Sequence, residues 1–286
     1  MANLKEIRNR IASVSSTMQI TSAMKMVSAA KLKKAQDAIT AMRPYANKLT
    51  ELLQSLSATL DADSGSKFSI QREVKKVLIV AITSNRGLAG AFNSNIIKEV
   101  NRLTTKTYAN KDVSYIAIGK KGNDAFKKSN KVIANESTIY DDLTFDNVAE
   151  IAELLMAKFV AGEFDKIEIV YNKFKNAATQ EIMVEQFLPI VPVEGSVNTN
   201  ADYIFEPSKV EIVEQLIPKS LKTQLYKAIR DSFASEHGAR MTAMHKATDN
   251  ATELRDQLKL TYNKARQAAI TNEILVIVGG AEALKS

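Results

Sequence analysis

The chain has 286 residues, of which 45% are apolar, and it contains no Cys and no Trp. Its 39 Lys and Arg outnumber its 32 Asp and Glu, which gives a formal net charge of +7 at pH 7. This composition excludes a disulfide scaffold, a zinc–thiolate site, a thiol nucleophile and a disordered tail protein. No apolar run approaches the roughly 20 residues of a membrane-spanning helix, and the first residues do not resemble a secretory signal. We therefore expect a soluble protein that stays in the compartment where it is made.

The basic excess lies at the two ends of the chain. Residues 1–60 carry nine basic and three acidic side chains, a net charge of +6, whereas residues 61–207 have a net charge of −2 and residues 208–286 of +3. A stretch of one sign raises the local potential and indicates an acidic or polyanionic partner. Charge alone favours the simpler alternative, a solvated basic helix face.

Residues 1–60 are expected to form one long helix, because Leu4 to Leu60 contain no Gly and one Pro. Apolar residues with the 3, 4 spacing of a coiled-coil seam occur at Leu4, Ile7, Ile11, Val14 and Met18. The apolar seam then moves to Ile20, Met24, Val27 and Ala30, a shift that resembles a stutter. Pro44 is expected to kink or interrupt the helix, and residues 61–66 to end it.

Residues 208–286 are expected to form a second long helix. The 60 residues between Pro218 and Gly279 contain one Gly and no Pro, and a helix of this length would span roughly 90 Å. Its predicted seam is Met241, Met244, Thr248, Ala251, Leu254, Leu258, Thr261, Ala265 and Ala268. The residues in between are too few to cover such a helix, so it must pack against the N-terminal helix and against other chains.

Residues 74–190 follow a different pattern. Short apolar or alternating runs predict strands at 77–82, 113–118, 132–134, 166–171 and 181–187, with amphipathic helices between them. Apolar strands that alternate with helices are typical of a parallel or mixed α/β sheet. The predicted fold class is therefore α/β: a Rossmann-like domain inserted between the two helices of a long antiparallel coiled coil.

The central domain offers no clear catalytic chemistry. Ser84–Gly90 follow a predicted strand, but their G-x-x-G spacing lacks both the dinucleotide fingerprint and the Walker A motif, so a tight turn explains these glycines better. Gly119–Gly122 and Gly279–Gly280 are also expected to be a turn or a helix stop. His237 and His245 lie eight residues apart, too far to share a metal as an i, i+4 pair. We expect no catalytic residue, no cofactor and no metal.

Longer motifs are found at both ends of the chain and after the first predicted strand. They are LKEIRNRIASV (Leu4–Val14), QITSAMKMV (Gln19–Val27), TSNRGLAGAFN (Thr83–Asn93), EHGARMTAM (Glu236–Met244) and YNKARQAAITNEI (Tyr262–Ile274). In this order they closely resemble the gamma subunits of F-type, proton-translocating ATP synthases of the bacterial type. The resemblance extends over the whole chain and is strongest at its two ends.

The resemblance implies a fold and a function. In this family the two terminal helices form an asymmetric coiled coil inside a hexamer of alternating alpha and beta subunits, and the Rossmann-like domain forms a foot with the epsilon subunit on the membrane c-ring. Proton flow turns the ring and the shaft, whose asymmetry drives the catalytic beta sites through their binding states. The resemblance thus implies a rotary shaft that regulates ATPase activity and has no catalytic site or cofactor of its own.

Individual residues are assigned by the same resemblance. Contacts with the beta subunits are implied for Met24, Lys31, Lys33, Lys34, Arg240, Gln267 and Thr271. An apolar tip in the bearing of the hexamer is implied for Ile274, Leu275, Val276, Ile277, Val278 and Leu284. Tyr203 and Glu206 would lie on the foot, facing epsilon and the c-ring. The implied location is the cytoplasmic face of the bacterial inner membrane, reached only through the complex, with no nucleic-acid partner.

Two functions of other classes stay open at this point. A basic coiled coil could bind nucleic acid through Lys31, Lys33 and Lys34, with an affinity that falls steeply with salt. An α/β enzyme would instead bind a nucleotide such as ATP or NAD tightly.

Overall fold

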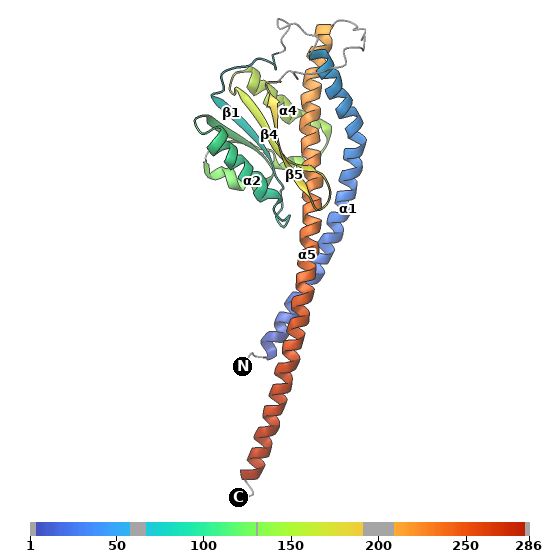
Figure 1. Ribbon diagram of the computed structural model, residues 1–286, viewed down its shortest axis with the longest axis vertical. Helices are drawn as coiled ribbons and strands as arrows, with labels where there is room; N and C mark the ends of the chain where they lie inside the picture. Colours follow the sequence, from blue (N-terminus) through green and yellow to red (C-terminus); the bar gives the residue numbers. More distant parts are fainter. Residues whose placement is uncertain (1–3, 58–66, 130, 191–208, 284–286) are drawn as a thin grey trace. The chain divides into compact units, whose positions relative to one another are not determined.

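The computed structural model describes residues 4–57, 67–129, 131–190 and 209–283 (Figure 1). The chain divides into two compact units, one of Met1–Ser28 with Met241–Ser286 and one of Ala29–Arg240. We call the first the helical unit and the second the α/β unit. The predicted division at 1–60, 74–190 and 208–286 follows the ends of the elements, whereas these units divide each long helix between them.

A five-stranded sheet forms the centre of the α/β unit. Its strands are β1 (Lys76–Ile82), β2 (Asp112–Ile118), β3 (Val132–Asn135), β4 (Lys166–Phe174) and β5 (Gln180–Leu188). The strand order is β3-β2-β1-β4-β5, with the first four parallel and β5 antiparallel to β4. All five strands expected from the sequence are present, and the Rossmann-like α/β fold is confirmed.

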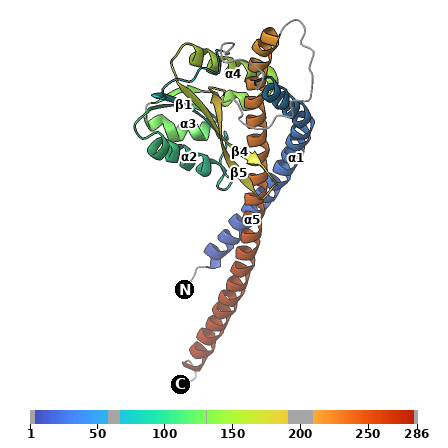
Figure 2. The same cartoon turned by 45° about the horizontal axis from the view of Figure 1, so that its top comes forward.

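Helices cover both faces of this sheet. They are α2 (Phe92–Arg102), the π-helical turn η2 (Leu103–Thr107), α3 (Lys120–Phe126), the short 3-10 turns η3 (Lys127–Ser129) and η4 (Ser137–Tyr140), and α4 (Phe145–Val160). Figure 2 shows α4 and α2 on opposite faces of the sheet. Leu78 and Val80 of β1 lie in a core with α4 and the C-terminal helix, whereas Val77 and Ile79 lie in a core with α2 and α3. Because β1 is buried on both sides, its sequence is an uninterrupted apolar run.

The two long helices are α1 (Leu4–Ser57) and α5 (Lys209–Ala283). The predicted interruption at Pro44 is wrong, because α1 continues through it, and α5 begins before Pro218. Beside Pro218, the side chains of Ile217 and Leu221 are buried in the sheet core, and this packing offsets the hydrogen bond that proline cannot make. Gly279 and Gly280 do not stop α5, since both are helical. The predicted end of α1 at 61–66 falls outside the described residues.

The α/β unit covers part of α5, which the sequence did not indicate. Five α5 residues lie in the same core as β1 and α4: Ile217, Leu221, Leu225, Ala228 and Ile229. Burial continues along α5 as far as Arg240. Only the later part of the helix therefore needs another helix or another chain as cover.

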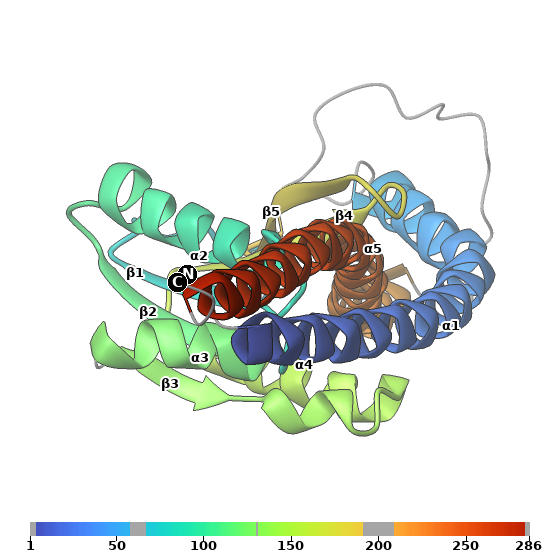
Figure 3. The same cartoon turned by 90° about the horizontal axis from the view of Figure 1, so that it is seen from below.

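In the helical unit, the start of α1 and residues 248–262 of α5 run antiparallel and side by side (Figure 3). Thr248 Oγ1 donates to Thr21 Oγ1 at 2.9 Å, Thr252 Oγ1 approaches Met18 Sδ at 3.4 Å, and Arg8 Nη2 donates to Tyr262 Oη at 2.8 Å. Residue numbers rise along one helix as they fall along the other, as the predicted antiparallel coiled coil requires.

The predicted stutter in α1 is wrong. Ile20 and Val27 are 60% and 57% exposed, while Thr21 and Ser28 are buried in their place. The seam keeps its 3, 4 spacing, with these two polar residues at seam positions. Their hydroxyls are hydrogen-bonded within α1: Thr21 Oγ1 donates to the Met18 carbonyl at 3.1 Å and Ser28 Oγ to the Met24 carbonyl at 2.7 Å. A hydroxyl satisfied within its own helix can be buried at little cost.

The predicted seam of α5 is correct as far as Ala251 and again at Leu258 and Ala265, but the other positions beyond Ala251 move by one residue. Leu254, Thr261 and Ala268 are exposed, and their neighbours Arg255, Tyr262 and Ala269 are half-buried instead. Arg255 Nη1 approaches Met18 Sδ at 3.5 Å. The long side chains of Arg and Tyr bury their stems and keep their polar ends accessible, a pattern that a purely apolar seam does not anticipate.

Gly119, between β2 and α3, is required by a close approach of two backbone segments. Its φ is +110°, and a Cβ at this position would lie 2.2 Å from the Thr83 carbonyl oxygen. The Thr83 N–H donates to the Ile118 carbonyl at 2.7 Å, so the two strand ends cannot separate without losing this bond.

We expect Gly119→Ala to lower the free energy of unfolding of the full chain by about 3 kcal/mol or more, through positive φ and overpacking. The matched control is Gly279→Ala, where a Cβ meets nothing within 4 Å and helix propensity predicts a change of about 1 kcal/mol in the stabilising direction. Urea unfolding followed by circular dichroism measures both variants. Equal stability of the Gly119→Ala variant and the parent chain would contradict the packing described.

Candidate interaction surfaces

Apolar side chains on α1 face away from the seam of the helical unit. Ile20 is 60% exposed, Met26 63% and Val27 57%. Met24, one of the predicted contact residues, is half-buried beside them. Such a row of large apolar side chains, within a helix pair that buries few of its own, indicates a surface that a partner covers.

The three predicted basic contacts lie on the next turns of α1, in the α/β unit. Lys31, Lys33 and Lys34 are all exposed. Lys33 forms a 3.0 Å ion pair with Asp37, and both side chains of this pair are more than half exposed. Between the lysines, Leu32 and Ala35 are buried, so α1 presents an apolar side to its own chain and a basic side to solvent.

Beyond the last contacts with α1, the end of α5 has no cover from the described part of the chain. Gln267 and Thr271 are exposed, as are all residues from Thr271 to Ala281. Five consecutive residues of this segment are large and apolar: Ile274, Leu275, Val276, Ile277 and Val278, each at least 55% exposed. The predicted tip residue Leu284 lies outside the described residues, as do Tyr203 and Glu206.

Arg240 differs from the other predicted contacts because it is buried. Its Nη1 forms a 2.6 Å ion pair with Glu236 Oε1, and both side chains are less than one-tenth exposed. Its Nη2 donates to the backbone carbonyls of Arg86 at 3.2 Å and Gly87 at 3.3 Å. The guanidinium is therefore engaged by its own chain, and the assignment of Arg240 as a partner contact stays a prediction.

Burial controls the ionisation of the residues beside Arg240. Desolvation raises the pKa of Glu236 above its usual range, although the positive charges of Arg240, Lys31 and Arg86 oppose the rise. Burial lowers the pKa of His237 to about 3, and Arg240 and Lys31 act in the same direction. The His237 ring packs edge-on against the Phe233 ring, with 4.5 Å between the ring centroids, and the buried His237 Nε2 has no hydrogen-bond partner. His237 is thus neutral and structural.

The loop after β1 does not form a phosphate cradle. Leu88 and Gly90 have positive φ values of 61° and 56°, which confirms the expected tight turn. The carbonyls of Arg86 and Gly87 face Arg240 of α5, and the N–H of Ser84 donates to Asn93 Oδ1 at 2.9 Å. Carbonyl oxygens aimed into this position repel a phosphate rather than bind it.

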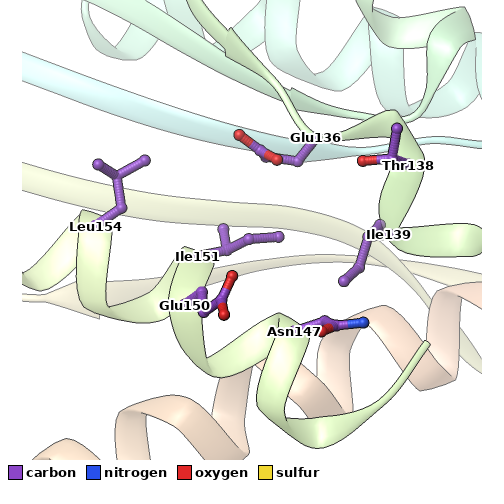
Figure 4. Close-up of a pocket in the computed structure, with 7 residues that line it drawn as sticks. All are labelled: Glu136, Thr138, Ile139, Asn147, Glu150, Ile151 and Leu154. Carbon is purple, nitrogen blue, oxygen red and sulfur yellow. The ribbon is translucent and has the colours of Figure 1, made fainter. Parts of the chain in front are cut away.

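A shallow cavity of about 400 Å³ opens on the α/β unit between η4 and α4 (Figure 4). Its lining residues are Glu136, Thr138, Ile139, Asn147, Glu150, Ile151 and Leu154. Figure 4 shows the two segments facing each other across it, with carboxylates on both sides and no nucleophile–base pair among the residues drawn. The described residues also hold no group of three or more His, Cys, Asp or Glu placed to bind a metal.

Among the described helices, none has a stretch both long and apolar enough to cross a membrane. The structure thus presents exposed contact surface on two long helices and no described catalytic constellation. These features place the chain in the class of proteins with two long terminal helices and a Rossmann-like α/β domain between them in the sequence.

Comparison with known proteins identifies its family. The family model described as ATP synthase matches residues 3–284. The ATP synthase gamma chain of Flavobacterium psychrophilum is 76% identical over 286 residues, which is 100% of each chain, and that of Christiangramia forsetii is 68% identical over 284 residues, 99% of each chain. The chain therefore belongs to the family of ATP synthase gamma chains.

Solved structures agree in fold. A chain in the Euglena gracilis mitochondrial ATP synthase, described as OSCP/F1/c-ring in rotational state 3, superposes with a TM-score of 0.70 at 21% identity, over 98% of this chain and 94% of that one. A rotor chain of the same synthase has a TM-score of 0.67 at 22% identity. At these identities the likeness shows the fold alone.

Sequence reasoning missed the buried polar cluster of Glu236, His237 and Arg240. One signal was available, since Glu236 and Arg240 are spaced i, i+4, the spacing of an ion pair on one helix face. Nothing in the sequence shows that this face packs against the loop after β1, because that contact joins residues about 150 positions apart.

The buried neutral state of His237 predicts a pH dependence of stability. Its pKa in the folded chain is about 3 and in the unfolded chain about 6.5, so the unfolded state takes up the proton first. This contribution to stability is complete above pH 6.5 and falls as the pH drops towards 3, by up to about 1.4 kcal/mol per pH unit.

Urea unfolding at pH 7, 6 and 5 measures this slope. We expect His237→Gln to reduce the loss of stability between pH 7 and pH 5, whereas the control His245→Gln, at an exposed position, keeps the parent slope. An unchanged slope in the His237→Gln variant would contradict the buried neutral imidazole.

Proposed function

We propose that the chain is the central rotary shaft, the gamma subunit, of an F-type ATP synthase. In this role it couples proton flow through the membrane c-ring to ATP synthesis at the catalytic beta subunits, regulates ATPase activity and performs no catalysis itself. The observation that carries the proposal is the exposed apolar surface along the helical unit, together with full-length identity to gamma chains of 76%. A helix pair with this surface requires an enclosing partner.

The enclosing partner is the hexamer of alternating alpha and beta subunits. Exposed Lys31, Lys33 and Lys34 supply positive charge for acidic loops of the beta subunits. Gln267 and Thr271 are exposed on α5 and supply polar contacts. Met24 joins this set because it lies beside the exposed apolar residues of α1.

The apolar end of α5 is the bearing tip. A water-exposed run from Ile274 to Val278 costs solvation free energy that an apolar sleeve would recover, at roughly 25 cal/mol per Å² of apolar surface covered. Such contact is non-directional, so it can hold a shaft on its axis while letting it turn. We assign Leu284, which lies outside the described residues, to the same tip.

We assign Tyr203 and Glu206, which lie outside the described residues, to the foot of the shaft, facing the epsilon subunit and the c-ring. The relatives are named as ATP synthase subunits and the structural neighbours include rotor and c-ring assemblies, which supports membership of such a complex. The chain would then sit peripherally at the cytoplasmic face of the inner membrane, held there by its partners alone.

Purification of the chain from native membranes tests the proposal. Co-elution with alpha, beta and epsilon subunits, at one copy per hexamer, is the expected result. Recovery with nucleic acid, or tight binding of ATP or NAD by the isolated chain in equilibrium dialysis, would contradict it.

Charge reversal at Lys31, Lys33 and Lys34 tests the basic surface. We expect the triple Glu variant to assemble, since all three side chains are exposed, and to lower ATP-driven proton pumping per ATP hydrolysed about twofold or more, because like charges then face the acidic loops. The matched control reverses the exposed Lys111, Lys127 and Lys128, giving the same change of net charge. Equal pumping by both variants would remove the charge argument.

Truncation before Ile274 tests the bearing tip. The isolated chain should keep its free energy of unfolding, because the described part of the deleted segment is exposed. In the complex we expect slower but persisting rotation and a raised loss of subunits on dilution, since the other shaft contacts remain. A truncated shaft that rotates and dissociates like the parent would exclude a bearing role.

A further inference from the structure

The crevice at the carboxyl ends of β1 and β4 is filled by α5. In parallel sheets of this kind, ligands bind where adjacent strands send their connections in opposite directions. Here β1 continues into α2, in the core on one face, while the α4 connection that precedes β4 lies in the core on the other face. Residues Ser235 to Arg240 of α5 occupy this position and contact the loop after β1 and the end of β4.

Arg240 makes the contact with the β1 side. Its guanidinium donates hydrogen bonds to Glu236 Oε1 at 2.6 Å and to the carbonyls of Arg86 and Gly87 at 3.2 and 3.3 Å. The loop that carries these carbonyls is itself fixed, because Ser84 Oγ donates to the Arg86 carbonyl at 2.6 Å. A planar guanidinium can meet a carboxylate and two carbonyls at once, whereas an ammonium cannot match this fork.

Other residues make the contact with the β4 side. Ser235 Oγ donates to the Asn172 carbonyl at 2.9 Å, and Asn172 Nδ2 donates to the Phe92 carbonyl at 3.2 Å. Ala239 packs in a buried cluster with Ala89 and Phe92. Four hydrogen bonds of Ser235, Asn172 and Arg240 thus tie α5 to β4 and to the loop after β1, and tie β4 to the start of α2.

Hydrogen bonds and apolar packing hold a helix in different ways. Apolar contacts such as those of Ile217 to Ile229 on the sheet are non-directional, so they resist separation more than rotation or sliding. Hydrogen bonds weaken steeply when their angle or distance changes. The cluster at the strand ends is therefore what fixes the rotational setting of α5 against the sheet.

We propose that Glu236 and Arg240, with Ser235 and Asn172, form a joint that locks α5 to the sheet and passes torque between the α/β domain and the shaft helix. This inference rests on the proposed rotary function. It gives Arg240 a positioning role inside the chain, distinct from a contact with the catalytic subunits. Because α5 is continuous from Lys209 to Ala283, torque that enters at this joint reaches the end of the helix.

The test is Arg240→Lys in the assembled complex. A partner contact that needs only positive charge survives this change, whereas the joint loses its bidentate geometry. We expect protons pumped per ATP hydrolysed to fall about twofold or more, and hydrogen exchange at the Arg86–Ala91 amides of the full chain to speed up about tenfold. Arg102→Lys is the matched control, since Arg102 pairs with Glu99 on an exposed helix face.

An engineered disulfide between α5 and the loop after β1 distinguishes the proposed joint from other roles of Arg240. Ala89 and Ala239 share a buried cluster with Phe92, and the chain has no Cys, so Ala89→Cys with Ala239→Cys introduces a single pair of thiols for oxidation to join. In the Arg240→Lys background, oxidation should restore pumping to the parent level and reduction should abolish the rescue.

Parent-level pumping in the Arg240→Lys complex would overturn the proposed joint, and so would a disulfide that forms but does not restore pumping. If the Arg240→Lys variant fails to assemble, unchanged hydrogen exchange at Arg86–Ala91 in the isolated variant chain would overturn it. If the parent chain itself lies outside a proton-pumping complex, the proposed function fails instead. The two failures are therefore distinguishable.

Discussion

The structure depends on a narrow seam between two antiparallel helices. In the helical unit small and hydroxyl side chains form part of this seam. Thr21 and Ser28 of α1 are buried where large apolar residues would be expected, and Thr248 donates to Thr21 at 2.9 Å. Such a seam lets the helices approach closely but buries little apolar surface. Several large apolar residues, Ile20 and Val27 among them, remain exposed, and for that reason the helix pair needs an enclosing partner.

The α/β unit is stabilised differently. Its sheet is buried on both faces, and α5 completes one of these cores before it leaves the domain. Beyond this apolar core, polar residues of α5 hold the helix to the sheet, because Arg240 and Ser235 donate hydrogen bonds to backbone carbonyls near the strand ends. Folds of this kind commonly bind nucleotides at the carboxyl ends of the strands, and here α5 occupies that position and is hydrogen-bonded to it. This arrangement explains, from the chain itself, why a Rossmann-like domain can serve a mechanical function.

Much of the fold could be predicted from the sequence, and the errors have physical causes. The five strands were predictable because strands buried on both faces, such as β1, are continuous apolar runs. The seam was misplaced because periodicity counts apolar residues, whereas Thr21, Ser28 and Arg255 satisfy their polar atoms locally or at the surface. For the candidate site, exposure of the lysines and of the apolar tip agrees with a contact role, but the burial of Arg240 arises from a long-range contact that no local pattern encodes.

Direct observation of rotation tests the central claim. A complex held by its hexamer, with a probe on the shaft at the exposed position Lys111 through Lys111→Cys, should show stepwise turning of the probe in one direction when ATP is added, since the chain has no other cysteine. A probe that stays fixed relative to the hexamer while ATP is hydrolysed at the normal rate would show that this chain is not the shaft.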